Sequence, residues 1–198
     1  MSDKYIVTIN RQFGSLGRPI AKQLAELLDI PVYDRDIVEK AASDINMSLK
    51  VVSKEEEKAS SRFATMQYPL GMGTSRIQDD IFYAQRKFII QTASTSSCIM
   101  VGRCSDYILS DEKPIRIFIY APYEERLKNC VDILNMEPSE AQKMIKAVDK
   151  ARDAYHMHYA GYLPGDRNHI DFCINSSTLG VEGSAKLIKD IVEIKMKK

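Results

Sequence analysis

A strand segment, a glycine loop and a helix follow one another directly near the amino terminus, and this order restricts the fold more than any other feature. Residues 5–10 read YIVTIN, a β-branched and apolar run typical of a buried strand. The loop RQFGSLGR occupies residues 11–18. Four apolar residues then recur at helical spacing: Ile20, Leu24, Leu27 and Leu28. Pro19 suits the first turn of that helix, where its missing N–H costs nothing.

Strands and helices alternate along the rest of the chain. Further buried strands are predicted at residues 30–33, 98–101, 116–120 and 172–175. Helices are predicted at residues 76–93, after Pro122, at residues 139–157 and at residues 181–194. Such alternation implies an α/β fold with a parallel sheet that is covered by helices on both faces.

Composition limits the classes of protein that the chain can belong to. Its 198 residues suit one domain, and 44% hydrophobic residues allow a real core. A formal net charge of +1 gives no global field that would recruit nucleic acid or a membrane surface. No apolar stretch approaches the roughly 20 residues that span a bilayer, and the short run at residues 5–9 is too brief for a secretion signal. We therefore expect a cytoplasmic protein.

Cysteine and histidine are too sparse to indicate a metal site. The four cysteines form no C-x-x-C pair, which argues against zinc binding and thioredoxin-like chemistry, and we expect all of them to be buried reduced thiols. The pair His156-x-His158 has no further histidine or carboxylate cluster beside it. We therefore predict no resident metal.

The glycine loop has the composition of a phosphate site. A helix amino terminus presents free N–H groups and a partial positive charge, and glycines before it let the backbone wrap an anion. The residues expected to bind nucleotide phosphates are Arg11, Gly14, Ser15, Gly17 and Arg18. The strict pattern G-x-x-x-x-G-K-[ST] is absent, because Gln12, Arg18 and Pro19 replace its first glycine, lysine and hydroxyl residue. A tight strand–helix turn with surface arginines is the alternative interpretation of these residues.

Several motifs, in order, resemble the cytidylate kinase-like family of bacteria. They are RQFGS and GR in the first loop, YD at 33–34, VGRCSDY at 101–107, DKARDAY at 149–155 and IDFCIN at 170–175. The resemblance implies a P-loop three-layer α/β/α fold like that of nucleoside monophosphate kinases, in a single domain over residues 1–198. It also implies a helical substrate-binding insert over about 36–95 and a lid region over about 135–168.

The same resemblance implies roles for three arginines. Arg18 substitutes for the P-loop lysine, Arg103 matches the arginine that binds the acceptor monophosphate, and Arg152 matches the first arginine of the lid. Positioned cations suit phosphoryl transfer, because negative charge spreads over the transferred oxygens and a guanidinium grips such oxygens in pairs. The alternative for each is a surface or ion-paired arginine.

Two aspartates are added to the acceptor site as candidates. Asp34, and Asp36 with it, could hold Mg²⁺ through water, orient the substrate or cap a helix. Asp106 could have the same roles at the substrate, and the alternative is that it caps a helix that begins at Tyr107. Tyr155 and Tyr159 are expected to be packing residues.

Five features depart from the family pattern. Asp34-Arg35-Asp36 replaces an Asp-Thr-Gly run expected near the second strand. Cys104 replaces an aspartate that contacts cytosine in cytidylate kinases, so the base specificity does not carry over. Tyr159 stands where the second lid arginine would fall. Leu16 replaces a usual glycine in the phosphate loop, and Pro19 a usual acidic residue.

The expected function is ATP-dependent phosphoryl transfer, with Mg²⁺, to a nucleoside monophosphate or a similar small phosphate-bearing acceptor. Two alternatives remain open: a nucleotide-binding sensor that has lost catalysis, and an oligomeric interaction protein that uses the helical insert as its interface. The sequence predicts neither a nucleic-acid nor a membrane partner and leaves the formation of homo-oligomers open.

Overall fold

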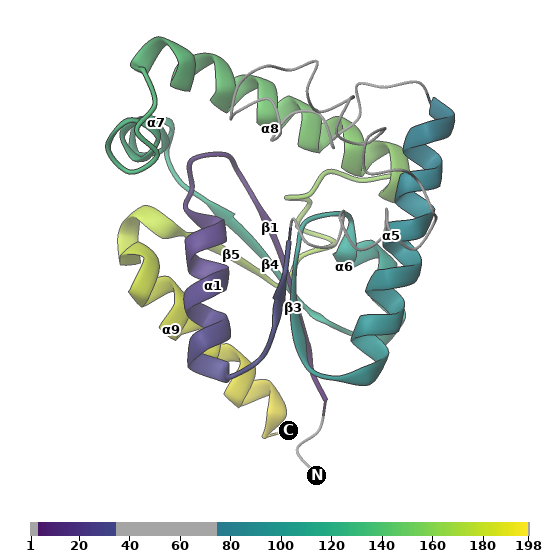
Figure 1. Ribbon diagram of the computed structural model, residues 1–198. Helices are drawn as coiled ribbons and strands as arrows, with labels where there is room; N and C mark the ends of the chain where they lie inside the picture. Colours follow the sequence, from purple (N-terminus) through teal and green to yellow (C-terminus); the bar gives the residue numbers. More distant parts are fainter. Residues whose placement is uncertain (1–3, 35–74, 198) are drawn as a thin grey trace.

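The computed structural model describes residues 4–34 and 75–197 and shows three layers, with helices on both faces of a parallel sheet (Figure 1). The five strands of the described chain are β1 (Ile6–Arg11), β2 (Val32–Tyr33), β3 (Cys98–Val101), β4 (Ile115–Tyr120) and β5 (Phe172–Asn175). Their order in the sheet is β2-β3-β1-β4-β5, and all neighbours are parallel. Because β1 is central, the loop that follows it lies in the middle of the carboxyl edge.

Helices α1 (Gly17–Leu28) and α9 (Ser176–Met196) pack side by side on one face of the sheet. Alternate strand residues such as Val7 and Ile9 face them and are fully buried. Ile20 and Leu24 of α1, one turn apart, are also fully buried against this face. Burial of each such side chain contributes roughly 1.5–3 kcal/mol, so this face anchors the start of α1 beside the end of β1.

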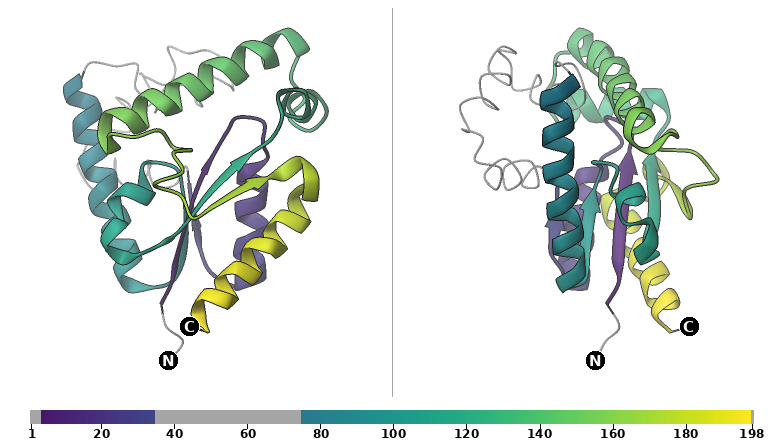
Figure 2. Two further views of the ribbon diagram at one scale, coloured as in Figure 1. Left: turned by 180° about the vertical axis from the view of Figure 1, so that it is seen from behind. Right: turned by 90° about the vertical axis from the view of Figure 1, so that its right-hand side faces the viewer.

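Helix α5 (Ser75–Thr95) and the short α6 (Ser105–Ile108) cover the opposite face. The other alternating residues of β1 and β3, including Ile6, Cys98 and Met100, pack there against Ile89 and Ala93 of α5. Figure 2 shows α5 and α9 on opposite sides of the strands when the molecule is turned by 90°. A 3-10 turn at Ser110–Glu112 leads into β4.

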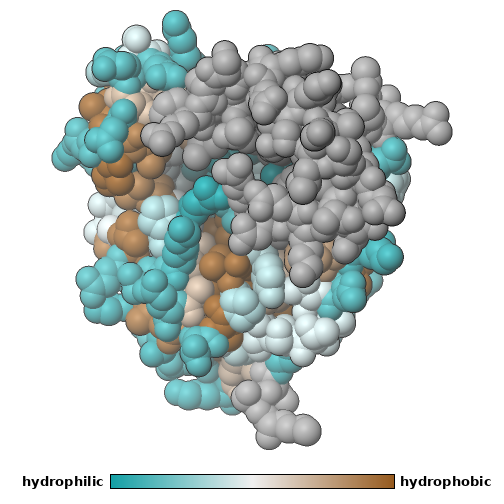
Figure 3. Space-filling view, viewed as in Figure 1, coloured by the Kyte–Doolittle hydropathy of each residue, from teal (hydrophilic) through white to brown (hydrophobic). Residues whose placement is uncertain are grey.

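Two further helices lie at the carboxyl edge of the sheet. Helix α7 (Tyr123–Asp132) follows β4, and the long α8 (Pro138–Ala160) crosses above the strand ends (Figure 1). A third apolar cluster joins them to the first loop, with Phe13, Cys130, Ile145 and Val148 buried in it. Hydrophobic side chains also reach the surface near this junction, at the upper left of Figure 3.

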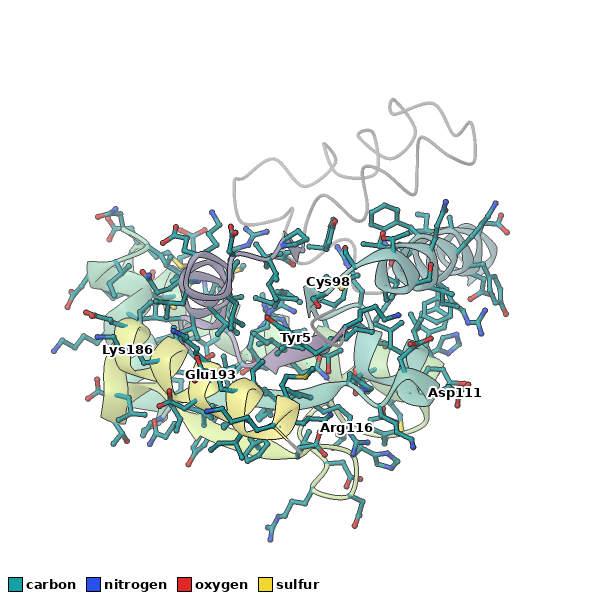
Figure 4. All side chains as sticks on the ribbon, turned by 90° about the horizontal axis from the view of Figure 1, so that it is seen from below. Tyr5, Cys98, Asp111, Arg116, Lys186 and Glu193 are labelled. Atoms are coloured by element: carbon teal, nitrogen blue, oxygen red, sulfur yellow. The ribbon has the colours of Figure 1, made fainter. Side chains whose placement is uncertain are left out.

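The described residues at the amino-terminal edge of the sheet are joined by a backbone hydrogen bond and an ion pair. Seen from below, Tyr5 and Cys98 lie close together there, while Lys186 and Glu193 of α9 point outward (Figure 4). Cys98 donates its backbone N–H to the Tyr5 carbonyl at 3.3 Å. Arg116 is paired with Asp171 at 2.9 Å where β4 and β5 begin. The candidate binding residues therefore belong to the opposite edge.

The predicted elements are confirmed, with small shifts at their ends. The helix predicted at residues 139–157 runs to Ala160, and the closing helix begins at Ser176 rather than 181, with a kink at Gly180. Residues 36–74 of the predicted insert lie outside the described residues. No described helix has the length and apolarity to cross a membrane. Three cysteines are buried thiols, but the prediction was wrong for Cys173, which is exposed because β5 is an edge strand.

Candidate functional site

The loop between β1 and α1 is folded back under α8 and leaves the helix terminus uncapped. Leu16 occupies the N-cap with φ 57° and ψ 21°, and its side chain makes no capping hydrogen bond. The first bond of the helical ladder runs from the Ile20 N–H to the Leu16 carbonyl at 3.0 Å. The amides of Gly17 and Arg18 therefore precede that ladder, and Pro19 has no N–H. The terminus retains the donors and dipole that attract an anion.

Ser15 holds this loop to the sheet from inside. Its buried hydroxyl donates to the carbonyls of Gln12 and Ile119, at 2.9 and 3.2 Å. Its own carbonyl accepts a bond of 2.7 Å from the Ser176 hydroxyl, at the start of α9. The Ser15 side chain is thus occupied, and only its backbone is available for a phosphate.

The glycines of the loop are required by close approaches. Gly14 has φ 76°, and a Cβ there would lie 2.8 Å from the Arg126 carbonyl oxygen. A Cβ on Gly17 would lie 2.8 Å from the Cβ of Arg11. Both glycines therefore let α7 and the side chain of Arg11 pack directly on the loop backbone.

Asp34, just after β2, is bound by two of the predicted arginines. Arg11 Nη2 lies 3.3 Å from Asp34 Oδ1, and Arg18 Nε lies 2.5 Å from Asp34 Oδ2. Burial by itself raises the pKa of Asp34, but the charges of Arg11 and Arg18 outweigh it and hold that pKa below its ordinary value. Asp34 is therefore an ionised counter-ion to these two arginines. Asp36 lies outside the described residues.

Arg103 leaves β3 in a turn of left-handed backbone. Gly102, Arg103 and Cys104 have φ values of 74°, 59° and 53° in succession. A Cβ on Gly102 would lie 2.2 Å from Arg11 Nη1, so the Arg11 guanidinium rests on that glycine. The charge of Arg103 lowers the pKa values of Asp34, Arg11 and Arg152, which places it within electrostatic reach of all three. The turn thus directs Arg103 toward the same group of charges.

Arg152 comes to this group from α8. Its Nη1 donates to the Arg11 carbonyl at 2.9 Å, and its side chain is only 16% exposed. Burial, together with the charge of Arg11, lowers the pKa of Arg152 to about 9, so it is still a cation at neutral pH. The predicted lid arginine therefore lies against the end of β1 in this structure.

Three polar residues that the sequence analysis missed fix the loop to α7 and α8. Asp149 Oδ1 accepts the Phe13 N–H at 2.7 Å, and its other oxygen is bound by Arg126 Nη1. Arg126 also donates to the Phe13 carbonyl at 3.3 Å, and Asn129 donates to the Gly14 carbonyl at 2.9 Å. A usable signal for Asp149 was its place three residues before Arg152, on the same face of a helix.

Together these residues form what we call the arginine cluster. Its members are Arg11, Arg18, Arg103, Arg126 and Arg152, with Asp34 and Asp149 as counter-ions. Five arginines against two aspartates leave an excess of three positive charges among the described residues of the cluster. Guanidinium groups this close repel one another and are favourable only when more negative charge arrives. Such an arrangement has the charge needed to hold an anion with several negative charges.

Asp106, by contrast, belongs to a separate group of side chains. It is 2% exposed, and its carboxylate is held by His156 and by the Tyr162 hydroxyl. The N-cap of α6 is Cys104, so Asp106 is not the cap either. Its role at the acceptor remains a prediction. His156 contacts this carboxylate, and the described residues hold no group of three or more potential metal ligands.

Tyr155 and Tyr159 pack as expected. Tyr155 is buried beside Phe82 and Cys104, and the Tyr159 ring stacks on Phe82 at 3.9 Å between centroids. The Tyr159 hydroxyl donates to Asp79 on α5 at 3.0 Å. The residue in place of the second lid arginine thus joins α8 to α5.

Known structures share this architecture. An uncharacterized protein from Eubacterium ventriosum is 27% identical, with 96% of this chain and 99% of that chain covered and a TM-score of 0.72. Shikimate kinase from Acinetobacter baumannii, in complex with shikimate, is 12% identical, and the match covers 100% of this chain and 97% of that chain with a TM-score of 0.57. Shikimate kinase from Bacteroides thetaiotaomicron is 11% identical, and the match covers 96% of this chain and 99% of that chain, also with a TM-score of 0.57. The fold is therefore that of P-loop kinases.

Sequence comparison gives a narrower assignment. No curated protein sequence matches this chain significantly. Residues 6–178 match the cytidylate kinase-like family, and this range includes the phosphate loop, the β3 turn and the whole of α8. The chain therefore belongs to the cytidylate kinase-like family.

Proposed function

We propose that this protein transfers the γ-phosphoryl group of ATP to a nucleoside monophosphate or a similar small phosphate-bearing acceptor. The observation that carries the proposal is the arginine cluster at the carboxyl edge of the sheet, beside an uncapped helix terminus. Ligands of open α/β sheets bind at that edge. In the reaction, the bond between the γ-phosphorus and its bridging oxygen breaks. An oxygen of the acceptor phosphate forms the new bond, giving ADP and a diphosphate.

Different residues of the arginine cluster suit different phosphate groups in the reaction. The loop amides and Arg18 suit the donor phosphates, Arg103 suits the acceptor phosphate, and Arg152 suits the oxygens of the phosphoryl group in transit. Arg18 must exchange Asp34 for phosphate when the donor binds, because its Nε is bound to Asp34. The freed carboxylate would then be available to Mg²⁺, which favours substrate phosphates, water and one or two carboxylates.

A first experiment tests the donor site. Saturating ATP with Mg²⁺ should raise the melting temperature, since a ligand at 100 times its Kd adds about 2.7 kcal/mol of stability. Arg18→Ala should remove most of this gain, and Arg86→Ala, a change on the exposed surface of α5, should leave it unchanged. Equal melting temperatures with and without ATP in the native protein would refute the proposal.

A second experiment tests the acceptor. A panel of nucleoside monophosphates, with shikimate as an acceptor that carries no phosphate, is incubated with ATP and Mg²⁺ while ADP is measured. Arg103→Ala should weaken binding of the active monophosphate by roughly 1.5–3 kcal/mol and leave ATP affinity nearly unchanged. Transfer to shikimate alone would show that the acceptor class is wrong.

One alternative function, nucleotide sensing without catalysis, is supported by two features of the first loop. Pro19 stands where a P-loop carries the Mg²⁺-binding hydroxyl, and the Arg18 side chain is engaged by Asp34. These two features favour a nucleotide sensor without catalysis. Such a protein would bind ATP in the first experiment and form no ADP above background with any member of the panel.

A further inference from the structure

His156 is a buried histidine for which the proposed transfer has no use. It lies on α8, and its side chain is 4% exposed. Its Nδ1 is 2.8 Å from the Tyr162 carbonyl oxygen, and its Nε2 is 3.0 and 3.1 Å from the two oxygens of Asp106. The Tyr162 hydroxyl donates to Asp106 Oδ2 at 2.9 Å. The ring thus joins α8 and the segment after it to α6.

Counting hydrogens around the ring determines its charge. A carbonyl oxygen only accepts, so Nδ1 must carry a hydrogen. Asp106 accepts from Tyr162 and from the side-chain amide of Asn10, as an ionised carboxylate does, and an ionised Asp106 requires that Nε2 also carry a hydrogen. With Asp106 ionised, either neutral tautomer would leave a ring nitrogen lone pair facing oxygen lone pairs in a buried place. His156 is therefore an imidazolium paired with the Asp106 carboxylate.

The surrounding groups favour this charged pair. Burial alone lowers the pKa of His156, but the bond and charge of Asp106 outweigh it and raise that pKa above its ordinary value. Burial likewise raises the pKa of Asp106, and the bonds from His156, Asn10 and Tyr162 reverse this and lower it. The other titratable or charged groups that face the pair are Asp153 of α8, Arg116 of β4, Cys104 before α6, and His169, which stacks on Tyr162 at 3.7 Å.

The helix that carries His156 also carries two members of the arginine cluster. Asp149, Arg152 and His156 follow one another at spacings of three and four residues, so they share one face of α8. Asp149 binds the Phe13 amide and Arg152 the Arg11 carbonyl, on the phosphate loop and at the end of β1. His156 is thus the next attachment of the same helix face, one turn beyond Arg152.

We propose that His156, as an imidazolium bound to Asp106, is a positioning residue that holds α8 so that Arg152 stays over the anion site, and that its deprotonation releases this hold. The inference rests on the proposed function, because it concerns the affinity of that site for ATP. The neutral ring would meet Asp106 with a lone pair, so α8 would lose its attachment at this turn. Apparent affinity then falls in proportion to the fraction of molecules that keep Arg152 in place.

The direction of the pH effect follows from the pair. A histidine whose pKa is raised on folding stabilises the fold fully below the unfolded value of about 6.5. This contribution is lost as the pH rises through the higher folded value. Affinity for ATP should therefore be greatest near neutral pH and fall on the alkaline side.

The test measures ATP affinity by calorimetry from pH 6.5 to 9 in three proteins: the native chain, His156→Gln and His158→Gln. His158 is a matched control, since it lies two residues further on the same helix and its side chain is 65% exposed. We expect the ATP affinity of the native chain and of His158→Gln to fall roughly tenfold between pH 6.5 and 9, a factor equal to about 1.4 kcal/mol. Glutamine can donate to Asp106 and does not titrate, so His156→Gln should lack the part of the loss that comes from His156. The titrations of ATP and of Arg152, whose pKa is about 9, are common to all three proteins. An alkaline loss in His156→Gln as large as in the native chain would overturn the inference and leave the proposed function intact.

A second measurement needs no nucleotide. Nuclear magnetic resonance should show the His156 ring titrating above pH 6.5, and Asp106→Asn should lower that midpoint. A midpoint at or below 6.5 in the native chain would overturn the inference. Failure of the native chain to bind ATP at any pH would instead refute the proposed function, and with it the link from His156 to the anion site, while the ring titration still decides whether the charged pair exists.

Discussion

Leu16, Arg103 and Cys104 hold left-handed backbone conformations that residues with a Cβ normally avoid. Each costs roughly 1–2 kcal/mol, and such strain is retained mainly where function requires the geometry. Leu16 begins α1 at its uncapped terminus, and Arg103 and Cys104 form the turn that carries an arginine to the arginine cluster. Three of the six described non-glycine residues with positive φ thus lie at the candidate site, and the other three, Asp29, Lys113 and Asn135, lie outside it.

Gly102 is the residue at which this turn meets Arg11. We expect Gly102→Ala to destabilise the fold and to weaken ATP binding, because its Cβ would lie 2.2 Å from Arg11 Nη1 at a φ of 74°. Gly161→Ala is the matched control: it has φ 81° and no atom within 4 Å of its added Cβ. Strain alone should cost each variant roughly 1–2 kcal/mol in urea unfolding. Equal losses of stability and affinity in both would show that contact with Arg11 is unimportant.

Leu16 gives a different prediction. A leucine would weaken ATP binding if the ligand forced the left-handed conformation on it, but Leu16 already has φ 57° in this structure. The strain is then shared by the free and bound states, so Leu16→Gly should change ATP affinity little. In the free energy of unfolding, the relief of about 1 kcal/mol of backbone strain should be offset by the greater conformational freedom that glycine gives the unfolded chain. Leu16→Ala keeps the Cβ and controls for the lost side chain. A tenfold gain in affinity on calorimetry for glycine alone would show that ATP binding forces the strained conformation on Leu16.

At the scale of elements, α8 is one uninterrupted helix from Pro138 to Ala160 that is attached to the core at successive turns. Asp149 binds the phosphate loop, Arg152 the end of β1, His156 the start of α6 and Tyr159 the helix α5. The region expected to hold a lid is therefore, in this structure, a helix whose polar face contacts four elements.

The attachment through Asp149 can be measured separately. Asp149→Ala removes the acceptor for the Phe13 N–H and leaves Arg126, which is 9% exposed, with its bond to the Phe13 carbonyl and without its carboxylate partner. Breaking a buried pair in this way costs up to about 3–5 kcal/mol, and we expect a loss near the lower end because Asp149 is 23% exposed. Asp149→Asn can still accept the Phe13 bond and should lose less. Urea unfolding of the two variants measures this order, and the reverse order would contradict the assignment.

Local signals account for most of what could be predicted from the sequence. The short apolar runs at Cys98–Val101 and Phe172–Asn175 indicated strands with the bounds that the structure has. Arg11, Arg18 and Arg103 were recognisable because they follow strands or a glycine loop. Arg126 and His156 were not, since their partners lie 23 and 50 residues away in the sequence and only the fold brings them together. The short α6 was missed because four residues carry too little periodicity.

At the scale of the whole molecule, a near-neutral chain gathers excess positive charge at one edge of its sheet. The formal net charge is +1, yet the arginine cluster alone has an excess of three. Burying cations together lowers stability unless anions compensate, and this is a common cost of a binding site. The free protein should therefore be less stable than its core alone would allow.

The last prediction tests this cost directly. Arg152→Met removes a buried cation that lies beside Arg11 and replaces it with a side chain of similar length, so the free variant should be more stable by about 1 kcal/mol. Millimolar tripolyphosphate should raise the melting temperature of the native chain above that in sodium chloride of equal ionic strength, and Arg152→Met should lose most of this rise. Lys150→Met, on an exposed position of the same helix, should keep it. If Arg152→Met instead melts at a lower temperature and still responds fully to tripolyphosphate, then Arg152 supports the fold through its bond to the Arg11 carbonyl, and the anion site lies elsewhere in the cluster.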